Sequence, residues 1–154
     1  MITSVLLFNS CNAVNKTTTN NNVTKEDSVK VLKNIVQESP IVIYDSHTRG
    51  YHFTFSVYET YATAIKEYNG KPIKVDVSSK DVKELKSIIK QIAEKEIASH
   101  EAPTKKRHYD GAPHTTITIF KKGEKYSSQT FDGGFPPKAL EVLVNKVLSL
   151  SPEK

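Results

Sequence analysis

Strict alternation of apolar and polar residues in YHFTFSVY, residues 51 to 58, is the strongest constraint on the fold of this chain. Phe53, Phe55 and Val57 would share one face of an extended strand, and His52 would lie on the other face with small polar residues. A period of two is typical of a strand that has one buried face and one wet face. The segment therefore predicts an antiparallel sheet with one side on the core.

Short turns join several such segments and predict hairpins. IVIYD (41–45) is joined to the alternating segment by the turn SHTRG. Further along, HTTITIF (114–120) and KYSSQTF (125–131) flank a turn at Lys122-Gly123. Tight turns between consecutive strands require antiparallel pairing. We therefore expect about six strands, paired mostly with their neighbours in the chain.

The dipeptide Asn69-Gly70 suits a type I′ turn, in which both central residues need positive φ. After it, Ile73, Val75 and Val77 alternate with charged residues. The segment predicts a hairpin whose second strand buries these three apolar side chains on one face.

Three segments carry apolar residues at three- and four-residue spacing, which predicts amphipathic helices. The first begins at Thr24 and stops before Pro40, the second runs from Ser78 to about Ala98, and the third ends near Pro152. Their apolar stripes are Val29, Leu32, Ile35 and Val36; Val82, Leu85, Ile88, Ile89, Ile92 and Ile97; and Leu140, Leu143, Val144, Val147 and Leu148.

These elements predict the fold class α+β. We expect a two-layer arrangement: a mostly antiparallel sheet of about six strands built from hairpins, packed by two or three amphipathic helices. The predicted domain covers residues 24–151 and is single, as the length of 154 residues suggests.

The only cysteine of the chain, Cys11, follows a short apolar segment, ITSVLLF, at residues 2 to 8. This arrangement resembles the end of a bacterial lipoprotein signal peptide, and the resemblance covers residues 1–11 only. It implies a lipid on Cys11, attachment to a membrane and a location in the bacterial cell envelope. Residues 12–23 are rich in Thr and Asn and cannot bury enough apolar surface to order, so they predict a disordered polar tether. The alternative is a cytosolic protein whose thiol has no such role.

Of the 22 basic residues, only Arg49 and Arg107 are arginines, and 17 acidic residues leave a net charge of +5. Proteins that read nucleic acids favour arginine because its planar fork grips phosphate and guanine. The composition therefore argues against a nucleic-acid partner. The chain also lacks a glycine-rich phosphate loop and a dinucleotide fingerprint, so we expect no cofactor.

Residues 99–113, SHEAPTKKRHYDGAP, predict a long loop, which in a compact domain is often functional. Its basic cluster suits an anionic partner such as lipid headgroups, a cell-wall polymer or an acidic protein surface. The connector DGGFPP (132–137) ends the strand paired with the one that this loop enters, so we expect nearby aromatic residues to join the same surface. The predicted binding surface consists of Lys105, Lys106, Arg107, His108, Tyr109, Asp110, Phe131 and Phe135.

The five histidines raise the alternative of a metal-dependent or hydrolytic enzyme. Its candidate residues are His100, His108, Asp110 and His114. Zinc takes three or four ligands, but the wide spacing of these residues along a loop fits ordinary surface histidines as well. Asp110 and Asp132 could form a carboxylate pair, but each precedes a glycine, and the dipeptide Asp-Gly is above all typical of turns. The sequence therefore favours a non-catalytic binding module for a protein or envelope ligand, of which immunity or inhibitor proteins are one version.

Overall fold

The computed structural model describes residues 38–152. The predicted leader, tether and first helix lie outside the described residues. The chain divides between Val36 and Gln37 into two units, and all the described residues belong to the second.

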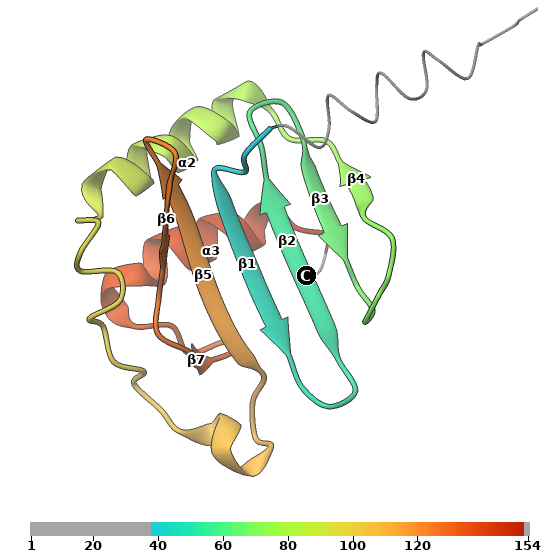
Figure 1. Ribbon diagram of the computed structural model, residues 1–154, viewed down its shortest axis with the longest axis vertical. Coiled ribbons are helices and arrows are strands. Elements are labelled where there is room, and N and C mark those ends of the chain that lie inside the picture. The colour runs from blue at the N-terminus through green and yellow to red at the C-terminus, as the bar shows by residue number, and fades with distance from the viewer. Residues whose placement is uncertain (1–37, 153–154) are drawn as a thin grey trace, which may run out of the picture. The chain divides into compact units, whose positions relative to one another are not determined.

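The described residues form an antiparallel sheet with two α-helices, as expected for the α+β class. Every strand pairing is antiparallel. The order across the sheet is β4-β3-β2-β1-β5-β6, and β7 also pairs with β5 (Figure 1). The elements are β1 (Val42–His47), β2 (His52–Val57), β3 (Ala62–Ile65), β4 (Ile73–Val75), α2 (Ser79–Gln91), η1 (Lys106–Tyr109), β5 (His114–Lys121), β6 (Glu124–Ser127), β7 (Phe131–Asp132), η2 (Lys138–Leu140) and α3 (Glu141–Leu150).

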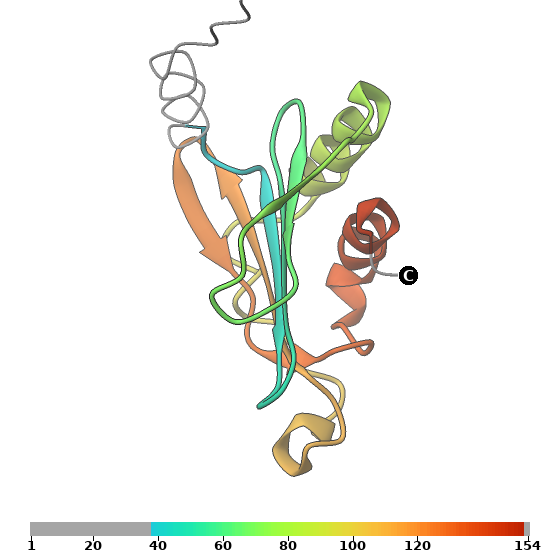
Figure 2. The ribbon, with the colours of Figure 1, turned by 90° about the vertical axis from the view of Figure 1, so that its right-hand side faces the viewer.

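The core lies between the sheet and the helices α2 and α3, which are on the same side of the sheet (Figure 2). On β2, Phe53, Phe55 and Val57 are fully or almost fully buried, and His52 and Thr54 are only partly buried. The predicted alternation of burial is confirmed from His52 to Phe55, but Ser56, which was expected on the wet face, is buried as well. Leu85 of α2 and Leu143 of α3 belong to the same cluster of buried residues, listed with the other core residues Ile41, Val42, Tyr44, Ala62, Ala64, Val82, Ile89, Ile97, Ile117, Ile119, Phe131, Leu140, Val144 and Val147.

Helix α2 begins as predicted but ends earlier. Ser78 is its N-cap, since its Oγ accepts a hydrogen bond of 3.1 Å from the backbone N–H of Asp81. The helix stops at Gln91 and not near Ala98, because Ile92 adopts an extended backbone and its carbonyl accepts a hydrogen bond from Lys121 Nζ instead. Among residues 38–152, no helix is both long and apolar enough to cross a membrane.

The predicted type I′ turn at Asn69-Gly70 is wrong by one residue. The backbone N–H of Gly70 donates to Glu67 O at 3.0 Å, so the turn is centred on Tyr68 and Asn69, and Asn69 alone of the two has positive φ, 61°. The β3–β4 pairing ends at Ile73, which is 56% exposed, so its predicted burial is also wrong. Strand β4 has three residues at the edge of the sheet, and a side chain there has a neighbouring strand on one side only.

A two-residue turn of the type expected at Asn69-Gly70 joins β5 to β6. Lys121 pairs with Glu124, which leaves Lys122 and Gly123 as a two-residue turn. Their φ angles are 52° and 82°, so both central residues meet the requirement of a type I′ turn. The predicted turn at this position is confirmed.

A one-residue bulge interrupts the strand predicted at 125–131 and separates β6 from β7. Thr118 pairs with Ser127 but Thr115 pairs with Phe131, so two residues of β5 oppose the three residues 128–130. Ser128 fills the gap, because its Oγ accepts the backbone N–H of Ile117 at 3.1 Å. One extra residue exchanges the two faces of a strand. The bulge therefore turns Phe131 into the core, and the next residue, Asp132, towards the opposite face.

Candidate functional site

The buried carboxylate of Asp132 holds the long loop against one end of the sheet. It accepts hydrogen bonds from Thr104 Oγ1, from the backbone N–H groups of Lys106 (2.6 Å) and Arg107 (3.1 Å), and from Arg107 Nη1 (2.9 Å). Burial by itself raises the pKa of Asp132, but the hydrogen bonds outweigh it and hold the pKa well below its ordinary value. Asp132 is therefore an ionised, fully buried group whose two oxygens already accept four hydrogen bonds.

The anchored segment folds into the short 3-10 helix η1. It ends at Tyr109 and is capped by Asp110, whose φ is 58°, and the N–H of Gly111 donates to Lys106 O at 2.9 Å. Tyr109 projects from η1 with 71% of its surface exposed. Lys106 Nζ lies 3.7 Å from the centroid of the Phe135 ring, a cation–π contact that joins the loop to the connector after β7. The segment that the sequence predicted as a long loop therefore contains a short helix held in a defined position.

Beside η1 lies a hollow of about 540 Å³, which we call the basic hollow. Three separate parts of the chain supply its wall: the turn between β1 and β2, the turn between β3 and β4, and the loop that leads into β5. The lining residues are His47, Thr48, Arg49, Tyr68, Arg107, His108, Asp110, Ala112 and His114. Both arginines of the chain and three of its five histidines therefore line one hollow.

Three histidines lie side by side across the sheet at this end. His47 at the end of β1 is the register partner of His52 on β2 and of His114 on β5. The rings of His47 and His114 are stacked, with centroids 5.8 Å apart and planes at 14°. The ring of His52 packs on Tyr68, with centroids 4.9 Å apart. Tyr68 in turn donates a hydrogen bond from its hydroxyl to the carbonyl of Thr48, which holds the β3–β4 turn against the hollow.

A carboxylate lies behind this histidine row. Asp45 Oδ1 is 3.2 Å from His47 Nδ1, and Asp45 Oδ2 accepts a hydrogen bond of 2.7 Å from Thr54 Oγ1. A carboxylate in this position accepts a hydrogen bond from the imidazole and orients the ring. The geometry suits a histidine that presents its other ring nitrogen to a ligand.

The structure brings together most of the residues that the sequence analysis assigned to the loop. Arg107, His108, Asp110 and His114 all line the basic hollow. Lys105 and Tyr109 are exposed beside it, and Lys106 and Phe135 are in contact with each other. Phe131 does not belong to this surface. It has no exposed area and packs in the core, because the bulge before it turns its side chain inward.

Sequence reasoning missed His47, Arg49 and Tyr68, which reach the basic hollow from two other turns. One signal was present in the sequence: SHTRGYH places two histidines and one of the two arginines around a single turn. Nothing local, however, shows that Arg49 and Arg107 lie at the same end of the sheet, because that depends on the pairing of β1 with β5.

The geometry gives no specific support to the metal alternative. In the part of the chain that the structure describes, no group of three or more His, Cys, Asp and Glu side chains is placed to hold a metal ion. His108, Asp110 and His114 line the basic hollow, but His100 is not among its lining residues.

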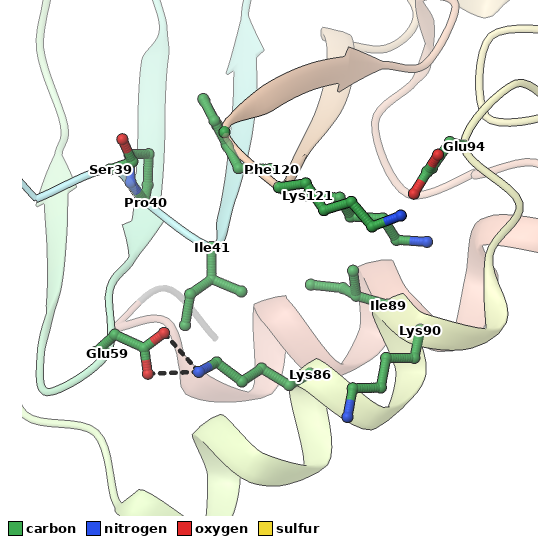
Figure 3. A pocket seen from close by; sticks show the side chains of 12 residues that line it. Ser39, Pro40, Ile41, Glu59, Lys86, Ile89, Lys90, Glu94, Phe120 and Lys121 are labelled. Carbon is green, nitrogen blue, oxygen red and sulfur yellow. Dashed lines mark hydrogen bonds and ion pairs between the residues drawn. The ribbon is translucent and has the colours of Figure 1, made fainter.

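A second hollow, of about 480 Å³, lies between α2 and the start of β1 (Figure 3). Its apolar lining includes Ile41, Ile89 and Phe120. Two of its lysines already have partners: Lys86 is paired with Glu59, and Lys121 donates to the carbonyl of Ile92. Because its lining contains neither arginine nor histidine, this hollow offers less recognition chemistry than the basic hollow does.

Comparison of the chain with known proteins gave no family assignment. No family model matches it, and no curated protein and no solved structure is significantly similar to it.

Proposed function

We propose that this protein is a non-catalytic binding module of the bacterial cell envelope, held at a membrane by a lipid on Cys11 and a polar tether of residues 12–23. Its binding surface is η1 with its neighbours and the basic hollow beside them. The partner is a protein or another envelope ligand with an acidic surface, as for an immunity or inhibitor protein. The resemblance of residues 1–11 to a lipoprotein signal segment supports the envelope location.

The observation that carries the proposal is the buried anchor at Asp132. A long surface loop normally loses conformational entropy when it binds, and a loop that is already held in place loses less. Asp132 accepts hydrogen bonds from the backbone N–H groups of Lys106 and Arg107, so the exposed Tyr109 belongs to a segment that is already held in place. Exposed tyrosine and arginine are the residue types that contribute most to protein interfaces.

The position of this surface suits a tethered module. Residue 38, where the described chain begins, lies near the start of β1, and η1 lies beyond the other end of the sheet (Figure 1). The proposed binding surface therefore lies at the opposite end of the sheet from the first described residue.

The finer form of the predicted fold belongs to the same proposal. We infer a two-layer domain built from hairpins, in which α2 and α3 form one layer and the sheet the other. The shared core of Phe55, Leu85 and Leu143 supports this arrangement. A single helical layer leaves the basic hollow at the end of the sheet open to solvent.

Two experiments test the proposal. Full-length protein with Cys11→Ser should leave the membrane fraction, and equal membrane retention of this variant and the wild type would refute the anchor. Partner capture from envelope extracts should yield one stoichiometric partner that is lost with Tyr109→Ala. The matched control is Val142→Ala on α3, which removes a comparably exposed apolar side chain outside the proposed binding surface. Equal capture by the two variants would refute the role of η1.

A further inference from the structure

The two guanidinium groups at the basic hollow differ in how far they are already engaged. Arg107 uses Nη1 for Thr104 O and Asp132, which leaves its Nε and Nη2 without a hydrogen-bond partner among residues 38–152. Arg49 makes no hydrogen bond or ion pair within the same residues. A guanidinium fork matches the two oxygens of a carboxylate or phosphate, and such paired hydrogen bonds are among the strongest in proteins.

The histidine side of the hollow changes its charge with pH. Histidine is the side chain whose charge ordinarily changes between about pH 5 and pH 8. Protonation of both His47 and His114 would place two positive rings in a stack with centroids 5.8 Å apart. An anion bound beside the two rings would favour their charged form, because an opposite charge nearby stabilises it. Binding of an anion is therefore coupled to uptake of protons.

The other charges around the hollow are of both signs. Arg49 from the β1–β2 turn adds a positive charge, and His108 from η1 adds a further imidazole. Asp110 lines the hollow and opposes an anion, while Asp132 balances Arg107 and Asp45 lies behind His47. The remaining titratable groups that face the row are His52 on β2 and Tyr68. The fixed charges are therefore two arginines against three carboxylates, so the histidines are the groups that can add positive charge to the hollow.

We propose, on the basis of the recognition function above, that the basic hollow binds the oxyanion group of a small ligand, a carboxylate or a phosphate ester, and takes up protons as it does so. Arg49 and Arg107 grip the oxyanion, and His47 and His114 bind it when they are protonated. The volume of about 540 Å³ is in the range of small-molecule sites and leaves room for a sugar-sized body attached to the anionic group.

The test is calorimetric titration of the full-length protein with three probes that share one sugar body: glucose 6-phosphate, glucuronate and glucose. Each titration is run at about pH 5.5 and about pH 8, where histidine is mostly protonated and mostly neutral. We expect at least one anionic sugar to bind and glucose not to bind. A phosphate ester changes its own charge near pH 6, so the glucuronate arm reports the protonation of the protein alone. If both anionic sugars bind, the hollow is a general oxyanion site. If only one binds, the site is specific for a phosphate ester or for a carboxylate.

The expected results are specific. Binding of the anionic sugar should be roughly tenfold or more tighter at the lower pH, and buffers of different ionisation enthalpy should reveal proton uptake. Arg49→Gln should weaken binding by roughly ten- to a hundredfold, as loss of charge-assisted hydrogen bonds predicts. The control Lys138→Gln removes an exposed positive charge that does not line the hollow and should change little.

Three results would overturn the inference: no binding of either anion at either pH, tighter binding of glucuronate at the higher pH, or equal effects of the two variants. Failure of this inference is distinguishable from failure of the proposed function. If capture of a partner still depends on Tyr109 while neither anion binds, the recognition surface stands and the oxyanion site is refuted. If an anion binds but no partner is captured, the oxyanion site stands and the proposed recognition of a partner is refuted.

Discussion

Replacing Asp132 by asparagine should destabilise the domain severely, although the two side chains have the same shape. Oδ1 of Asp132 accepts from the backbone N–H and Nη1 of Arg107, and Oδ2 accepts from Lys106 N–H and Thr104 Oγ1. The amide NH₂ is least harmful on the Oδ2 side, because the Thr104 hydroxyl can reverse and accept. Even then the N–H of Lys106 loses its partner, and Arg107 loses its counter-ion.

The two losses set the magnitude. An unsatisfied buried N–H costs about 1–3 kcal/mol, and breaking a buried ion pair costs about 3–5 kcal/mol. The side chain of Arg107 is 14% exposed and can turn towards solvent, so the losses do not add in full. We expect the free energy of unfolding to fall by about 3–5 kcal/mol, out of a typical total of about 5–15 kcal/mol.

The pH dependence provides an independent check. The pKa of Asp132 is lowered in the folded state, so its ionised form stabilises the fold at every pH above the ordinary aspartate value of about 3.9. This contribution disappears as the pH falls through the lower, folded-state value. The difference in stability between wild type and Asp132→Asn should therefore be complete at neutral pH and shrink in strong acid.

The assay is urea denaturation followed by circular dichroism, with hydrogen exchange at the backbone amides of Lys106 and Arg107. Asp110→Asn is the matched control, since Asp110 is exposed and asparagine tolerates its positive φ of 58°. The control should change stability by less than about 0.5 kcal/mol. Equal stability of the two variants, with unchanged protection of both amides, would refute the role assigned to Asp132.

Three further changes test the fold. Ser128→Ala should cost about 1–3 kcal/mol in urea denaturation, because the buried N–H of Ile117 loses its acceptor; the exposed Ser87→Ala on α2 should cost nothing, and equal effects would contradict the bulge. Lys122→Asn should stabilise the domain, by up to about 1 kcal/mol, because asparagine tolerates positive φ better than lysine does; a lower thermal midpoint would argue against this turn. Lys146→Met should lower stability at low ionic strength and lose its effect in high salt, because Lys146 bridges α3 to Asp81 and Glu84 of α2, which raises its own pKa and lowers that of Asp81. An effect of Lys146→Met that is independent of salt would point to packing instead.

Local sequence signals determined those elements whose formation depends on near neighbours. The alternation around Phe55 gave the core-facing side of β2, because successive side chains of a strand point to opposite sides. Ser78 gave the start of α2, because an N-cap bonds to a backbone N–H only three residues away. The turn at Lys122-Gly123 depends only on the φ angles of its own residues.

Contacts between distant residues decided the rest. Tyr68 moved the predicted turn by one residue, because its ring packs on His52 and its hydroxyl bonds to Thr48, about twenty positions earlier. The bulge at Ser128 reversed the faces of the residues after it, and so buried Phe131, which the sequence analysis had placed on the binding surface.

The candidate site shows the same division. The loop that carries Arg107, His108 and Asp110 was identifiable from its composition and length. That Arg49 lies at the same hollow followed only from the pairing of β1 with both β2 and β5, which places the ends of three strands together. Periodicity reports which residues are buried, whereas a binding site is formed by segments that meet only once the sheet has paired.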